Sequence, residues 1–197
     1  MKRSALDRLV SWVGLALAAV LVVAGVLLTV ASTFVNGQVA TQLADQKITM
    51  PVAAAYANLA PEDQAALAPF DGQEMTNGAQ AKAFADHYIQ AHIKAMAGGK
   101  TYEEVSGEFI KLSKDANADP AELKKLGDLR QTMFMGATLR GMLLNAYAFG
   151  TMALIAGIAA IGAFVGATVL LVLTWLGFRH AKDASGEALD GKAAAAE

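Results

Sequence analysis

The feature that most constrains this chain is an uncharged stretch over residues 141–178, made up mainly of apolar residues and glycine. About 20 such residues are enough for a helix to cross a bilayer. At about 1.5 Å per residue, a helix over 128–178 is roughly 75 Å long, more than twice a hydrocarbon core of about 30 Å. The stretch therefore predicts a transmembrane helix over 151–178 that continues beyond the membrane or bends at one of its glycines.

A second uncharged run covers residues 9–35 and follows a basic start. Secretory signal peptides begin in the same way, and the small residues at 29–31 form an acceptable cleavage site. The apolar part of a signal peptide is about 7–15 residues long, however, and this run is much longer. We favour an uncleaved transmembrane helix over 9–35, with cleavage as the alternative.

The basic residues that flank the two runs predict the orientation. They stand at Lys2, Arg3, Arg8, Arg179 and Lys182. Cytoplasmic flanks of transmembrane helices carry an excess of Lys and Arg. We therefore expect residues 1–8 and the tail 179–197 in the cytoplasm, with 36–150 outside a plasma membrane that the chain crosses twice.

The segment between the two runs contains residues that typically start and end short helices. Three of the four prolines fall within 49–75, which predicts irregular structure there, because proline breaks helices. Helices are expected at 61–67, 77–96, 102–116 and from Asp119 onward, each with a proline or a polar capping residue at its start. The tail 179–197 is expected to be disordered or loosely helical.

No strand-like alternation interrupts this pattern. The predicted fold is an all-α membrane protein in which two antiparallel transmembrane helices extend into an extracytoplasmic helical bundle. The composition agrees, since 55% of the residues are hydrophobic and the mean hydropathy is +0.38.

Small residues crowd the second transmembrane run. Gly162 and Gly166 form a GxxxG motif, and Gly157 lies five residues before it. Small residues let membrane helices approach closely. They can pack the two runs on each other, or leave one face for another copy or another protein.

A stripe at spacings of four and three residues precedes the membrane, at Met135, Leu139, Met142, Ala146 and Phe149. Methionine adapts well to contact surfaces. We therefore expect an interaction surface at Met133, Met135 and Met142.

Two polar residues stand at the outer end of the second run. Arg140 is expected to reach lipid headgroups or to pair with an acid of the central segment. Asn145 is expected to form a hydrogen bond between the two helices.

Catalysis, a cofactor or a metal site is not indicated. The chain has no cysteine, a net charge of −2 that gives no argument for nucleic acid binding, and no recognisable catalytic motif. His87 and His92 are five residues apart, about 140° round a helix, and cannot easily share a metal ion.

Several phrases of the sequence resemble a family of small, uncharacterised two-pass membrane proteins of actinobacteria. They are residues 46–51, 76–81, 97–102 and 135–147 (QKITMP, TNGAQA, AGGKTY and MGATLRGMLLNAY). Members are sometimes labelled aromatic ring-opening dioxygenase. The resemblance covers most of the chain and implies no established activity. The label would require iron held by two histidines and a carboxylate, and His180 is predicted across the membrane from His87 and His92.

These observations predict an accessory or scaffolding subunit of a larger cell-membrane complex. Its partners would be membrane lipids and other membrane subunits, or further copies of itself. The alternative is an oligomeric transport or lipid-handling protein, for which the threonines and serines of the spans give limited support.

Overall fold

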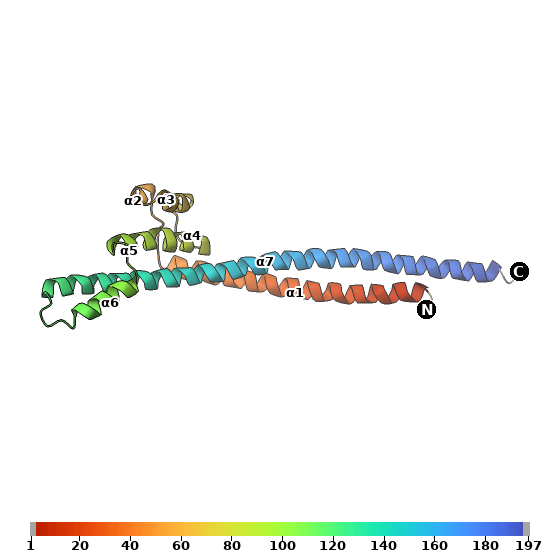
Figure 1. Cartoon of the computed structure of the whole chain (residues 1–197). Helices are drawn as coiled ribbons and strands as arrows, with labels where there is room; N and C mark the ends of the chain where they lie inside the picture. Colours follow the sequence, from red (N-terminus) through yellow and green to blue (C-terminus); the bar gives the residue numbers. More distant parts are fainter. Residues whose placement is uncertain (1–2, 195–197) are drawn as a thin grey trace. The chain divides into compact units, whose positions relative to one another are not determined.

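The computed structural model of the chain describes residues 3–194, and the surroundings of side chains within 5–183. Its elements are α1 (Arg3–Asp45), α2 (Ala53–Tyr56), α3 (Pro61–Leu67), the 3-10 helix η1 (Ala68–Phe70), α4 (Gly78–Ala83), the π-helix η2 (Phe84–Ile89), α5 (Gln90–Met96), α6 (Tyr102–Leu112) and α7 (Pro120–Ala194) (Figure 1). The described residues contain no strand, and an isolated bridge joins Thr49 to Glu74. The prediction of an all-helical chain is confirmed.

The chain divides into two compact units. Residues Met1–Phe34 and Ala153–Glu197 form one, here called the two-helix unit, and Val35–Met152 form the other, the central unit. The sequence placed these boundaries at 35/36 and 150/151. Both α1 and α7 take part in each unit, because each is a single uninterrupted helix.

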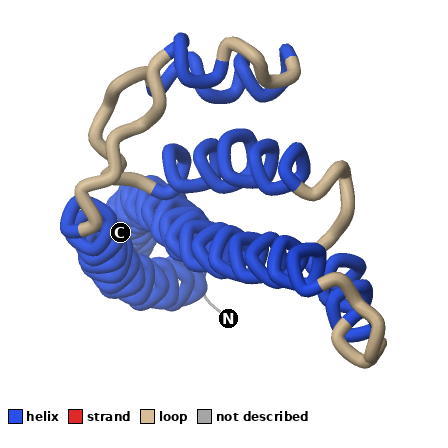
Figure 2. The backbone as a smooth tube through the Cα atoms, turned by 90° about the vertical axis from the view of Figure 1, so that its left-hand side faces the viewer, coloured by secondary structure: helices blue, strands red, loops and turns tan. Residues whose placement is uncertain are grey.

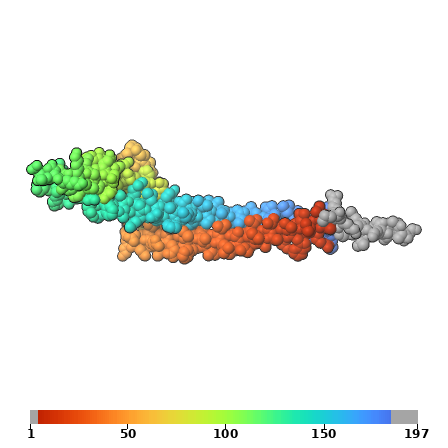
Figure 3. Space-filling model, turned by 60° about the horizontal axis from the view of Figure 1, so that its bottom comes forward, coloured from red at the N-terminus to blue at the C-terminus, as the bar shows by residue number. Residues whose placement is uncertain are grey.

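Small side chains at every seventh position form the contact within the two-helix unit. They are Ser11, Ala18, Gly25 and Ser32 on α1, and Ala153, Ala160, Ala167, Thr174 and Ala181 on α7. All are buried except Ser32, which is half-buried and donates a hydrogen bond to the carbonyl of Ala153 at 2.7 Å. A seven-residue repeat is the period that keeps one seam facing a partner helix. The two backbones can therefore lie close together along this seam. Figure 3 shows α1, in red to orange, lying against the blue part of α7.

The outer surface of the two-helix unit is apolar. Two helices, α1 and α7, are long and apolar enough to cross a membrane, and only 11% of the most apolar window of each is buried inside the protein. Leu27, Ile161 and Trp175 are among the large side chains that remain exposed. Soluble monomers rarely expose contiguous apolar surface on this scale, so this surface is suited to contact with lipid.

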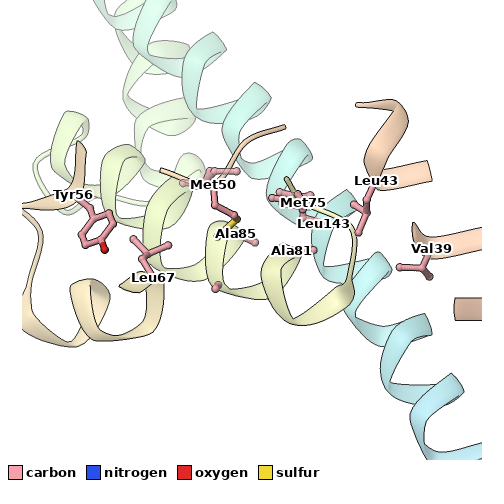
Figure 4. Packing of buried hydrophobic residues seen from close by; sticks show 11 residues of the cluster. Val39, Leu43, Met50, Tyr56, Leu67, Met75, Ala81, Ala85 and Leu143 are labelled. Atoms are coloured by element: carbon pink, nitrogen blue, oxygen red, sulfur yellow. The ribbon is translucent and has the colours of Figure 1, made fainter. Parts of the chain in front are cut away.

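The central unit has three layers. The consecutive helical segments α4, η2 and α5 form the middle layer, between α2–α3 and the first half of α7 (Figure 2). Met50, Leu67 and Met75 are fully buried between these layers, and Leu143 of α7 and Leu43 of α1 complete the cluster (Figure 4). A smaller cluster around Val105 joins α6 to α7.

The start signals in the sequence are confirmed. Pro61 and Pro120 begin α3 and α7, and Asn77 and Thr101 each form a capping box with a residue three positions later. Gly98 and Gly99 follow α5 with positive φ angles, as expected for residues that end a helix.

Other boundaries differ from the prediction. The helix predicted at 102–116 ends at Leu112, because residues 113–115 form hydrogen-bonded turns instead. The short helix α2, which follows Pro51 directly, was not predicted. The long final helix does not bend into two at a glycine and continues through the tail to Ala194. Residues 1–2 and 195–197 of the two expected cytoplasmic ends lie outside the described residues.

Gly78 allows α4 to touch the backbone of α7. A Cβ at this position would lie 2.9 Å from the Cα of Tyr147 and 3.1 Å from the carbonyl oxygen of Ala146. Backbone atoms cannot rotate away as a side chain can, so the first turn of α4 would have to move.

We therefore expect Gly78→Ala to lower the free energy of unfolding by about 1–3 kcal/mol, as overpacking does. The matched control is Gly107→Ala, where a Cβ meets nothing within 4 Å. Removing a glycine from the interior of α6 should stabilise the protein by up to about 1 kcal/mol. Thermal unfolding in mild detergent checks both, and equal midpoints for the two variants would contradict the close approach.

Candidate interaction site

A charged cluster fixes α7 to the π-helix η2. Arg140 donates from Nη2 to Oδ1 of Asp86 at 2.8 Å, and Lys82 donates from Nζ to Oδ2 at 2.5 Å. Burial of the Asp86 carboxylate by itself would raise its pKa, but the two hydrogen bonds and positive charges outweigh burial and hold the pKa below its ordinary value. Of the two partners expected for Arg140, the structure shows an acid of the central unit.

The π-helix directs neighbouring side chains to different layers. Its hydrogen bonds span five residues instead of four, a local widening that often occurs at functional positions. Asp86 points to α7, while Nδ1 of the adjacent His87 lies 2.8 Å from Oδ1 of Asp63 on α3. One turn of helix thus connects both other layers of the central unit.

The two histidines of this region have separate partners. Nδ1 of His92 lies 2.7 Å from the carbonyl oxygen of Tyr88, one turn away in the same helical segment, whereas His87 faces α3. Within the part of the chain that the structure describes, no three residues of the kinds that bind metals come together.

The stripe recognised in the sequence lies on the surface of the central unit. The side chains of Met135, Leu139, Met142 and Phe149 are 54%, 41%, 64% and 55% exposed, and Ala146 is half-buried. We call these five residues the α7 stripe. The charged cluster lies on another side of α7, so the stripe is held in place by contacts that do not cover it.

A groove of about 450 Å³ lies between α7 and the last turns of α1, and four residues of the α7 stripe line it: Leu139, Met142, Ala146 and Phe149. Val39, Leu43 and Ile48 line it from the α1 side. Asp45 is the only charged residue in its lining, and it forms no ion pair with a described residue. The groove therefore combines apolar side chains with the amides of Gln42, Gln46 and Asn145 and one unpaired negative charge.

Two residues expected at the interaction surface are placed differently. Met133 is only 2% exposed and packs against Ala97 and Val105 in the smaller core cluster, so it supports the bundle and is not part of an outer surface. Asn145 is exposed and lines the groove. Its side chain makes no hydrogen bond with a described residue, so the expected bond between the helices is not formed.

The three glycines singled out in the second span differ in their surroundings. A Cβ at Gly157 would lie 3.1 Å from Oγ of Ser32, and one at Gly166 would lie 3.3 Å from Leu21, so both face α1. A Cβ at Gly162 would meet nothing within 4 Å. The GxxxG motif is therefore divided between an internal contact and an open surface.

The main contact seam is not described by the GxxxG motif. Its signal is the recurrence of Ala, Ser, Thr or Gly at intervals of seven residues in both apolar runs, at 11, 18, 25 and 32 and at 153, 160, 167, 174 and 181. This spacing is visible in the sequence once the two runs are compared.

No family model, curated protein or solved structure matches the chain. The resemblance to an actinobacterial family therefore stays a prediction, and function is inferred from the geometry.

Neutralising the acid of the charged cluster should destabilise the central unit. We expect Asp86→Asn to lower the free energy of unfolding at pH 7 by about 1–3 kcal/mol, because Arg140 would lose the charge of its half-buried partner. Asp128→Asn is the control, since its ion pair with Lys124 is largely exposed and such pairs contribute about 0–1 kcal/mol.

The same cluster predicts a pH dependence. Because folding lowers the pKa of Asp86, its stabilising effect is complete above the ordinary aspartate pKa of about 4 and is lost as the pH falls through the lower folded value. The difference in unfolding free energy between wild type and Asp86→Asn should therefore shrink in that acid range. A difference that stays constant from pH 7 to pH 3 would contradict this assignment.

Proposed function

We propose that the chain is an accessory or scaffolding subunit of a larger cell-membrane complex and acts without catalysis. Its two apolar helices would cross the plasma membrane as antiparallel spans, with both termini in the cytoplasm. The central unit would lie outside the membrane and present the α7 stripe to another subunit.

Contacts in the two-helix unit support the antiparallel arrangement. Ser11, near the start of α1, fills the space beside Gly177, and Ser32, further along α1, bonds to Ala153. The basic residues that precede the first span and follow the second favour cytoplasmic termini.

The observation that carries the proposal is the exposure of the α7 stripe. If Arg179 marks the inner boundary, even a span as long as the run 9–35 ends near residue 152. All five stripe residues then lie outside the hydrocarbon core, where lipid tails cannot cover them. Covering apolar surface stabilises an association by about 25 cal/mol per Å² before the costs of binding.

The groove that the stripe lines indicates the chemistry of the partner. Its apolar side chains suit an amphipathic helix that places side chains at intervals of three and four residues. The unpaired carboxylate of Asp45 favours a Lys or Arg at the edge of that helix.

The topology can be tested by single-cysteine labelling, because the natural chain has no cysteine. We expect Ser113→Cys, between α6 and α7, to react with an impermeant maleimide on intact cells. Lys182→Cys should react only after the membrane is permeabilised. The reverse pattern would show that the central unit faces the cytoplasm.

The docking surface can be tested by site-specific photo-crosslinking in cells. A photoreactive residue at Met142 should give a discrete adduct with another membrane protein. One at Ala137 should not, because this exposed position lies about 160° round α7 from Met135. Leu139→Glu should reduce the Met142 adduct by at least about tenfold, since a charge would enter an apolar contact.

The control for that variant is Ala137→Glu, which adds the same charge outside the stripe and should leave the adduct unchanged. An adduct of twice the chain's own mass would identify a homo-oligomer and overturn the accessory role. Equal adducts from Met142 and Ala137 would show that the stripe is not a specific surface.

A further inference from the structure

A second groove, of about 700 Å³, lies within the two-helix unit at the ends that carry Asp7 and Arg179. Leucines such as Leu6, Leu170 and Leu173 form its apolar part. Its far end carries charged groups, so the groove is amphipathic along its length. It is separate from the α7 stripe and involves none of the residues proposed to contact a protein partner.

Aromatic residues mark the level of this groove relative to a bilayer. Both tryptophans of the chain, Trp12 and Trp175, lie at this end. Trp12 packs edge-to-face on Phe178 with ring centroids 5.6 Å apart, and the Arg179 guanidinium lies 5.9 Å from the Trp175 ring. Tryptophan is enriched where hydrocarbon meets lipid headgroups. The charged end of the groove thus has the chemistry of the headgroup region.

The side chain of Thr174 lines the groove. Thr174 is only 6% exposed, and its hydroxyl forms no hydrogen bond with a described residue. Ser11, which also lines the groove, is already satisfied by the carbonyl of Asp7 at 2.8 Å. The Thr174 hydroxyl can therefore donate to an acceptor that enters the groove.

The charges at the mouth are partly paired and partly free. Nδ1 of His180 lies 3.2 Å from Oδ2 of Asp7. Arg179 and Asp183 also line the groove, and neither forms an ion pair with a described residue. One cation and one anion are thus available, and the matching headgroup carries one charge of each sign.

We propose that this groove binds a zwitterionic phospholipid whose headgroup carries a primary ammonium, as in phosphatidylethanolamine. Arg179 contacts the phosphate, Asp183 accepts hydrogen bonds from the ammonium, and Thr174 donates to an ester oxygen of the glycerol. The acyl chains lie along the leucines. The proposal rests on the insertion of α1 and α7 in a membrane and is independent of docking at the α7 stripe.

The charge balance of the lining distinguishes this lipid from the others. An anionic lipid would satisfy Arg179 but leave Asp183 facing a negative headgroup. A choline headgroup has the same net charge as ethanolamine but no N–H to donate to a carboxylate. The groove should therefore prefer ethanolamine over both choline and glycerol headgroups.

Native mass spectrometry of the full-length chain in mild detergent tests this preference. Phosphatidylethanolamine, phosphatidylcholine and phosphatidylglycerol with identical acyl chains are titrated separately. We expect the first to bind about fivefold more tightly than the other two, the effect of one charged contact at a solvent-accessible site. Equal binding of all three would overturn the proposal.

Three substitutions assign the preference to the groove. Arg179→Gln and Asp183→Asn should each remove most of the selectivity for phosphatidylethanolamine. Thr174→Val should weaken the binding of all three lipids alike. Lys182→Gln, an exposed base outside the lining, should have no effect. Circular dichroism confirms that each variant is folded. Selectivity that survives the Arg179→Gln/Asp183→Asn pair would overturn the proposal.

Soluble phosphoethanolamine distinguishes a lipid site from a site for the free headgroup. A tenfold excess over the lipid should leave the lipid adduct intact, because the apolar contacts contribute most of the binding. Displacement would overturn the lipid assignment. Neither result depends on a protein partner. The lipid site can therefore be disproved without disproving docking at the α7 stripe, and the reverse also holds.

Discussion

The close approach of α1 and α7 along their seven-residue seam is the contact on which the two-helix unit depends. In lipid the hydrophobic effect does not drive helices together, so packing and hydrogen bonds between helices must do so. Ser32 and Ala153 supply such a bond, and the alanines along the seam let both backbones come near. The large aliphatic residues are left on the outside, where they face the surrounding medium.

The central unit relies on a different balance of forces. Its layers enclose an apolar core around Met50, Leu67 and Met75, and a few polar contacts connect the layers. Asp86 and His87 on one π-turn bond to α7 and α3 respectively. The α7 stripe is left uncovered because α4, η2 and α5 pack on another side of α7, so the fold itself creates the surface proposed for docking.

Much of this fold could be predicted from local signals. Pro61, Asn77, Thr101 and Pro120 marked helix starts correctly, since capping depends on neighbouring residues alone. The π-turn could not be predicted, because no local signal marks it and the partners of its Asp86 and His87 are distant in the sequence. Met133 was misplaced because it was chosen for being a methionine. It is not part of the periodic stripe, and in the structure it packs in the smaller core cluster with Val105 of α6. The stripe and Arg140 were identified in the sequence, while the groove that the stripe lines requires α1 and α7 to be seen together.

The absence of space along the seam limits how this sequence can vary. A Cβ at Gly14 would meet the Thr174 hydroxyl at 2.6 Å, and one at Gly177 would collide with Ser11. Exchanges at these positions are confined to the smallest amino acids, and a larger one would need a compensating reduction on the opposite helix. The outward-facing apolar positions carry no such restriction and can drift among Leu, Ile and Val. Related chains should therefore share small residues at seven-residue intervals more often than they share continuous stretches of identical sequence. Such a relationship is hard to detect by ordinary sequence alignment.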